Sequence, residues 1–99
     1  MHILIVNFNL DGITRTEFES ACDELAPTFA AIPRLVCKHW LADESTNTYG
    51  GVYVFESEQA LQDYQASELF AEVAGNPAFA NCSARAFGRL EAASAVTRA

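Results

Sequence analysis

The 99-residue sequence has few basic side chains. Six Lys and Arg residues stand against 13 Asp and Glu residues, which gives a formal net charge of −7. Binding to nucleic acid requires cations that displace the counterions of the phosphates, and the sequence contains no basic patch. The same shortage disfavours binding to an anionic membrane surface. We therefore expect neither nucleic acid nor a membrane as a partner.

Long hydrophobic runs and paired cysteine motifs are also missing. The longest apolar run, Ile3–Val6, is far too short to span a bilayer, and the first residues lack the features of a secretory signal. The three cysteines, Cys22, Cys37 and Cys82, form no C-x-x-C pair, and their spacing to the two histidines indicates no metal site. We therefore expect a cytoplasmic protein with free thiols and no bound metal.

Cofactor and nucleophile motifs are absent as well. The sequence has no Walker loop, no dinucleotide fingerprint, no G-x-S-x-G and no H-E-x-x-H. Gly50-Gly51 opens a predicted strand instead of joining a strand to a helix, so it does not predict a phosphate site. We interpret it as a bulge or a close backbone approach. No cofactor is expected.

Hydrophobic residues are plentiful, at 51% of the chain, which is a high share for a protein with room for one small core. The length allows a single domain, which we assign to residues 1–91. Residues 92–99 are small and unpatterned, and we expect this tail to be loose or to lie over a neighbouring molecule.

The first predicted helix has a clear beginning. Thr14 and Glu17 have the spacing of a capping box. Pro27 lacks a backbone N–H donor and clashes with the preceding turn, so we expect a kink or a restart near Ala26. The apolar positions of this helix fall in one stripe, which contains Phe18, Cys22, Leu25, Phe29 and Ile32.

The second helical region is predicted to consist of two pieces. Ser57 caps the first piece. Its apolar residues and those that follow point in opposite directions on one continuous helix, which predicts a break near Ala66. Ser67 then caps a separate short helix, which Gly75-Asn76-Pro77 ends.

Predicted strands separate these helices and complete the fold. They cover His2–Asn9, Arg34–Asp43, Tyr49–Glu56 and Phe79–Leu90, with a hairpin loop over residues 44–47. The order β-α-β-β-α-β is typical of the ferredoxin-like α+β fold, a four-stranded antiparallel sheet with helices on one face.

Both faces of the predicted sheet are apolar. In the first strand Leu4 and Val6 lie on one side, while Ile3 and Ile5 lie on the other. An antiparallel sheet with one solvated face should instead alternate apolar and polar residues. Because the helices can cover only one face, we expect the other to meet a second copy in a two-fold homodimer.

The second strand carries the main candidate for acid–base chemistry. His39 is the only internal histidine and therefore the most available general base near neutral pH. It shares a predicted strand face with Leu35, Cys37 and Leu41. The alternative role is that of a hydrogen-bonded histidine in the core or at an interface.

Lys38 and Trp40 point to the opposite side of that strand. If its face is buried, Lys38 needs a carboxylate or an anionic ligand, or else its stem extends toward solvent. Trp40 either packs in the core or lines a pocket for a flat ligand. Tyr53, on the third strand, either hydrogen-bonds a substrate oxygen or is a satisfied structural hydroxyl.

A series of residues across the middle of the chain is distinctive: Pro33, Lys38, Trp40, Gly50-Gly51-Val52-Tyr53-Val54-Phe55, Ala60 and Tyr64. Over residues 3–90 this pattern resembles the YdhR-like monooxygenase family. The resemblance implies a dimeric α/β barrel, in which two ferredoxin-like subunits pack sheet on sheet. It also implies a relation to cofactor-independent monooxygenases of polyketide and quinone metabolism. Cys37 replaces a tryptophan of the family pattern, so a pocket bounded there would be wider or differently shaped.

The leading functional hypothesis is therefore a cofactor-independent monooxygenase. It would act on a small aromatic or polyketide-like molecule in an apolar pocket between the sheet and the helices. We assign catalysis to His39 and Tyr53, and substrate binding to Lys38, Trp40, Phe55 and Tyr64. The alternatives are a non-catalytic dimeric module that binds a small ligand, and a lyase or isomerase on the same barrel.

Overall fold

A computed structural model describes residues 1–99, and its elements follow the predicted order with one addition. The strands are β1 (His2–Leu10), β2 (Leu35–Asp43), β3 (Thr48–Phe55) and β4 (Phe79–Gly88). The helices are α1 (Arg15–Ala30), α2 (Glu58–Gln65), α3 (Glu68–Gly75) and α4 (Glu91–Val96). The predicted βαββαβ order is confirmed. The addition is α4, a short exposed helix in the segment that the sequence indicates to be an unpatterned tail.

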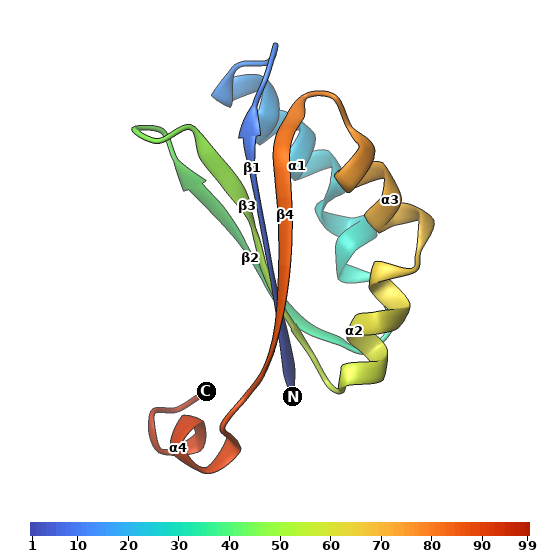
Figure 1. Ribbon diagram of the computed structural model, residues 1–99, viewed down its shortest axis with the longest axis vertical. Coiled ribbons are helices and arrows are strands. Elements are labelled where there is room, and N and C mark those ends of the chain that lie inside the picture. The colour runs from blue at the N-terminus through green and yellow to red at the C-terminus, as the bar shows by residue number, and fades with distance from the viewer.

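The four strands form one antiparallel sheet in the order β2-β3-β1-β4. Helices α1, α2 and α3 all lie on the same side of this sheet, to the right of it in Figure 1. None of these three covers the opposite side, and α4 stands apart beyond the end of β4. This arrangement is the ferredoxin-like fold. We call the two sides of the sheet the helix face and the bare face.

Side-chain caps set the starts of the first three helices, as the sequence predicts. Thr14 and Glu17 form a reciprocal capping box, in which each backbone N–H donates to the other side chain at 3.1 Å or less. Ser57 and Ser67 each accept a hydrogen bond from a backbone N–H three residues later. The predicted break at Ala66 is confirmed, because Ala66 is the C-cap of α2 and Ser67 is the N-cap of α3.

The predicted restart of the first helix near Ala26 is wrong. Helix α1 runs without a break from Arg15 to Ala30 and includes Pro27. The proline is exposed and lies one turn before the end of the helix. Asp23, whose carbonyl loses its intrahelical donor, is also exposed, so water can bond that carbonyl.

A bulge near the start of β2 changes one predicted neighbour of His39. The pairing with β3 shifts between Leu35 and Cys37, so one extra residue enters the strand. Leu35 therefore packs against the core on the helix face. Cys37 and His39 lie on the bare face, and the prediction that Leu35 shares this face is wrong.

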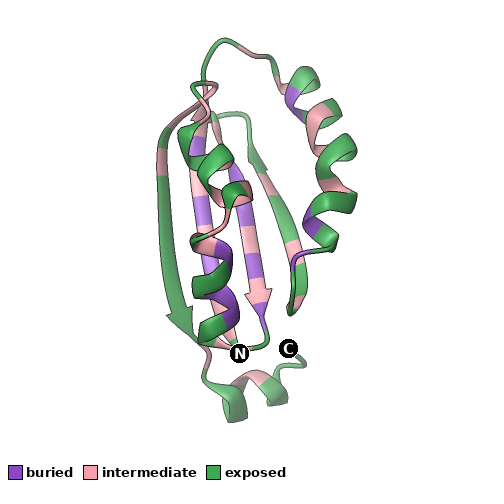
Figure 2. Cartoon of the chain, turned by 90° about the vertical axis from the view of Figure 1, so that its right-hand side faces the viewer, coloured by how far each residue is buried: buried purple, intermediate pink, exposed green.

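The core lies between the helix face and the three helices. Leu4 and Val6 of β1 are 0% and 1% exposed, whereas Ile3 and Ile5 on the bare face are only partly buried. Figure 2 shows this alternation of buried and intermediate residues along the central strands. The sheet is thus apolar on both sides, as the sequence indicates, but only one side is covered within the chain.

The chain offers few groups for binding metals. All three cysteines are free thiols. No three His, Cys, Asp or Glu side chains are grouped so that they could hold a metal ion. None of the helices combines the length and the hydrophobicity that crossing a bilayer requires.

Candidate functional site

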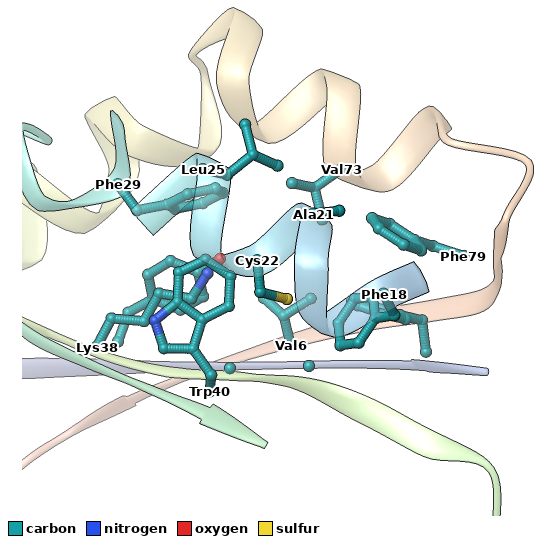
Figure 3. Close-up of a pocket in the computed structure, with 14 residues that line it drawn as sticks. Val6, Phe18, Ala21, Cys22, Leu25, Phe29, Lys38, Trp40, Val73 and Phe79 are labelled. Carbon is teal, nitrogen blue, oxygen red and sulfur yellow. The ribbon is translucent and has the colours of Figure 1, made fainter. Parts of the chain in front are cut away.

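An aromatic pocket lies between the helix face of the sheet and helices α1 and α3. Eleven of its 14 lining residues are hydrophobic, and its cavity volume is about 40 Å³. Figure 3 shows Trp40 and Phe18 at the level of the sheet, with Leu25 and Val73 above them on the helices. An apolar pocket with few polar groups is the usual form of a small-molecule site.

Lys38 supplies the only charged side chain of this aromatic pocket, and it is also the only lysine in the chain. Its Nζ lies 3.6 Å from the centre of the Phe29 ring and 3.3 Å from that of Trp40. The Tyr53 ring is 4.7 Å away. None of the ion pairs in the structure includes Lys38. Aromatic faces, and no carboxylate, therefore surround its amine.

Burial changes the protonation of this amine. Removal from water lowers the pKa of Lys38 to about 7, while the nearby Cys22 acts weakly in the opposite direction. The ring faces also favour the cation. At neutral pH the side chain is consequently divided between ammonium and amine, so it can either pair with an anion or accept a proton.

A glycine makes room for the lysine stem. A Cβ at Gly51 would lie 2.7 Å from Lys38 Cε and 3.3 Å from the Tyr53 ring. At Gly50 a Cβ would lie 1.8 Å from the carbonyl oxygen of Val6. The predicted close backbone approach at Gly50-Gly51 is confirmed. Because Gly51 has no side chain, the stem of Lys38 can lie against the backbone there.

Two buried phenols form a hydrogen-bonded pair beside the pocket. The hydroxyl of Tyr64 donates to that of Tyr53 at 2.9 Å. Burial raises the pKa of Tyr64 to about 12 and raises the pKa of Tyr53 further. Both phenols therefore stay protonated at neutral pH, where they can donate hydrogen bonds but cannot act as bases.

This pair also joins the aromatic pocket to a second, more open hollow. Tyr53 lines the former, and Tyr64 lines the latter, which lies between the end of α1, α2 and the start of α3. The hollow has a volume of about 460 Å³. Arg34 and Asp63 at its border form an ion pair of 2.8 Å.

The structure brings three of the six predicted site residues together. Lys38, Trp40 and Tyr53 line the aromatic pocket, and Tyr64 is linked to it only through the Tyr53 hydroxyl. Phe55 is 0% exposed and stacks on Tyr53 inside the core, so it does not line the pocket.

His39 lies apart from the other predicted site residues. It is exposed and pairs with Val52 on the bare face, across the sheet from the pocket. Successive side chains of a strand point to opposite faces, so His39 and Lys38 cannot serve the same site within one chain.

Sequence reasoning missed the helical side of the pocket. Phe29, Cys22 and Leu25 line it together with Val73 of α3 and Phe79 of β4. The first three belong to the apolar stripe of α1, which the sequence analysis assigns to the core. Of these, Phe29 lies under the amine of Lys38, a contact that depends on how α1 packs against β2 and that the sequence does not show.

Comparisons with known proteins agree with this architecture. A model of the family described as "Putative mono-oxygenase ydhR" matches residues 3–99. No curated protein matches the chain.

Several solved structures share the fold. The heme-degrader MhuD from Mycobacterium tuberculosis, with two hemes bound in its active site, has a TM-score of 0.72 at 20% identity, over 91% of this chain and 96% of that one. SnoaB, a cofactor-independent oxygenase from Streptomyces nogalater, has a TM-score of 0.68 at 24% identity, over 90% of this chain and 93% of that one. A dimeric ferredoxin-like protein of unknown function from Thermobifida fusca has a TM-score of 0.68 at 24% identity, over 90% of this chain and 92% of that one.

Proposed function

The chain belongs to the YdhR mono-oxygenase family, and on this premise we propose that it oxygenates a small, flat, acidic molecule in the aromatic pocket. The substrate class is an activated phenol, an anthrone-like ring or a 1,3-diketone. Such molecules ionise readily, and their anions can react with O₂ directly. No cofactor is then needed, because the substrate itself supplies the electrons.

The observation that carries this proposal is the position of Lys38. A single cationic group in an aromatic pocket, without a carboxylate partner, is complementary to a flat anion. The rings of Trp40 and Phe29 stand at 75° to each other, so a planar substrate can stack on one of them and meet the edge of the other. The Tyr53 hydroxyl, which is 2.9 Å from that of Tyr64, supplies a polar group beside the pocket that can hydrogen-bond a substrate oxygen.

The reaction can be written with these groups alone. The neutral amine of Lys38 takes a proton from the acidic CH₂ or hydroxyl of the substrate, and the resulting ammonium pairs with the substrate anion. The anion passes an electron to O₂, recombination forms a C–O bond, and the Lys38 ammonium returns its proton to the peroxide anion to give a hydroperoxide. Loss of water leaves a carbonyl group. One oxygen atom of O₂ ends in the product and the other in water.

Two features of the pocket favour this chemistry over heme degradation, which one structural neighbour carries out. No histidine lines the pocket, so the commonest nitrogen ligand for heme iron is missing. The open volume of about 40 Å³ is also far below that of a porphyrin. Even a single-ring substrate requires movement, which Trp40 and Leu25 can supply because they are 37% and 43% exposed.

We also propose that the working form is a homodimer joined through the bare face. Partly exposed apolar side chains on this face include Ile3, Ile5, Val52 and Val54, and Phe87 is 41% exposed. The Thermobifida neighbour is described as dimeric, which supports the proposal. Light scattering should show a dimer at micromolar concentration, and a stable monomer would overturn the dimer proposal.

Oxygen consumption tests the enzymatic proposal. The protein is incubated with a panel of anthrones, quinols and 1,3-diketones in an oxygen electrode, and the products are analysed after reaction under ¹⁸O₂. We expect one labelled oxygen atom in each product molecule and one O₂ consumed for each turnover. Product formation without oxygen would instead indicate an isomerase or lyase.

A ligand-binding module without catalytic activity is the second candidate. The observation in its favour is the small number of titratable groups in the pocket, where only Cys22 and Tyr53 accompany Lys38. Tight binding of panel members without oxygen consumption or product formation would select this function.

A further inference from the structure

The amine of Lys38 is the one basic group that lines the aromatic pocket, and no carboxylate pairs with it. Of the basic side chains without a carboxylate partner, Arg85 and Arg98 are exposed to solvent, whereas Lys38 lines the aromatic pocket. The nitrogen lies among ring faces at 3.3 to 4.7 Å. No hydrogen bond fixes its lone pair, so the nitrogen is available to react with an electrophile in the pocket.

We propose that Lys38 is a covalent carbonyl-binding site, whose amine condenses with a small 1,3-diketone or aromatic aldehyde held against the ring of Trp40 or of Phe29. This inference goes beyond the proposed oxygenation and does not depend on it, because condensation needs no O₂. The two activities share only the pocket and the unprotonated amine.

The step balances without an oxidant or reductant. The nitrogen lone pair attacks the carbonyl carbon, a C–N bond forms, and a proton moves from nitrogen to oxygen to give a carbinolamine. The C–O bond then breaks and water leaves, which produces an imine. With a 1,3-diketone the imine tautomerises to a conjugated, planar enaminone. Hydrolysis reverses the whole sequence.

The surroundings of Lys38 favour this condensation at neutral pH. The titratable groups that face it are Cys22 from α1 and Tyr53 from β3, and α3 contributes none. Burial raises the pKa of both groups, so neither holds the lysine as a permanent ion pair. Burial lowers the pKa of Lys38 itself to about 7. Apolar walls also disfavour the return of water to a finished imine.

The aromatic residues around Lys38 can also accept a planar adduct. The lysine stem lies beside the backbone of Gly51, and its nitrogen lies over the faces of Phe29 and Trp40. These two rings stand at 75° to each other, so a planar, uncharged enaminone can stack on one of them without a counter-ion.

The experiment uses the fact that the chain has one lysine. In Gln62→Lys a second lysine is introduced on the exposed face of α2, where it serves as an internal reference for an ordinary amine. The protein is treated without oxygen with acetylacetone, and separately with benzaldehyde plus cyanoborohydride. Near-ultraviolet absorbance detects the enaminone, and peptide mass spectrometry locates each modification.

We expect Lys38 to be modified at least about tenfold faster than the introduced lysine at pH 7, because far more of its amine is unprotonated. The Lys38 rate should level off above pH 7, whereas that of the introduced lysine should climb toward pH 10. Lys38→Met should abolish the adduct on the peptide that contains residue 38, and any enaminone that remains should map to the introduced lysine or to the N-terminal amine of Met1.

Equal rates at the two lysines, or modification of the introduced lysine alone, would overturn the proposal. Modification of Lys38 only after denaturation would do the same. Oxygenation in the absence of any adduct would reject the covalent site alone, and an adduct without oxygenation would reject the proposed function alone.

Discussion

The two faces of the sheet both carry apolar side chains, but they differ in which side chains these are. On β3 the helix face carries Tyr53 and Phe55, while the bare face carries Val52 and Val54. The first pair is at most 2% exposed and the second is partly exposed. Large aromatic rings close a core and a pocket, whereas small branched side chains leave a flat surface. One strand thus serves two purposes through alternation alone.

The same division appears on β2 between adjacent residues. Lys38 enters the aromatic pocket, and His39, its neighbour, faces away from the chain. We thus propose that catalysis takes place on the helix face and that the dimer forms through the bare face. Substitutions on either side should therefore have separable effects.

The largest effect is expected where the strands themselves come too close for any side chain. Gly50 has a φ of +151°, and an added Cβ would lie 1.8 Å from the carbonyl oxygen of Val6. Gly50→Ala should therefore lower the free energy of unfolding by about 4 kcal/mol or more. Urea denaturation measures this, and a loss below about 1 kcal/mol would show that β1 and β3 can separate there.

A charge on the bare face should separate the proposed dimer. Ile3 faces Val54 on β3 and Phe87 on β4, so Ile3→Asp would bury a carboxylate among apolar side chains at the interface. We expect the dimer dissociation constant to rise at least about a hundredfold, which corresponds to about 2.7 kcal/mol. Gln62→Lys, on exposed α2, is the control and should leave the mass in light scattering unchanged. An Ile3→Asp protein that keeps the mass of the wild type would place the interface elsewhere.

The pH dependence of stability should distinguish Lys38 from a surface lysine. Unfolded lysine holds its proton up to about pH 10.4, whereas folded Lys38 loses it near pH 7. Between these values the unfolded state binds more protons, so this residue adds stability as the pH rises. From pH 7 to 10 the wild type should gain about 1–2 kcal/mol over Lys38→Met, a figure reduced for partial solvent exposure. A difference independent of pH would mean that the folded amine titrates normally.

The smallest effect concerns the buried phenols. Tyr64→Phe removes the partner of the Tyr53 hydroxyl and should cost about 1 kcal/mol in the free energy of unfolding. The double variant with Tyr53→Phe should cost less than the sum of the two single changes, because no hydroxyl is left unpaired. Additive losses in urea denaturation would indicate that the two hydroxyls do not interact.

Local features of the chain could be predicted from the sequence. The capping residues Thr14, Ser57 and Ser67 are confirmed, because each acts on backbone groups within three residues. The opposite orientations of Lys38 and His39 are also confirmed, since they follow from strand alternation.

Long-range features could not be predicted in this way. The sequence does not show which side of β2 the helices cover, so His39 received a catalytic role although it lies on the bare face. The bulge that turns Leu35 to the core depends on pairing with β3. The aromatic surroundings of Lys38 include Phe29, which lies nine residues earlier in the chain, on α1. Tertiary packing of α1 against the sheet brings the two side chains together.

The most direct test of the account compares adjacent substitutions on the two faces. Oxygen consumption is measured for Lys38→Met and His39→Ala with whichever panel substrate the wild type turns over. We predict that Lys38→Met lowers kcat/KM at least about a hundredfold, because it removes the base and counter-charge, and that His39→Ala stays within about twofold of the wild type. Loss of activity in His39→Ala with retention in Lys38→Met would contradict the assignment of chemistry to the helix face.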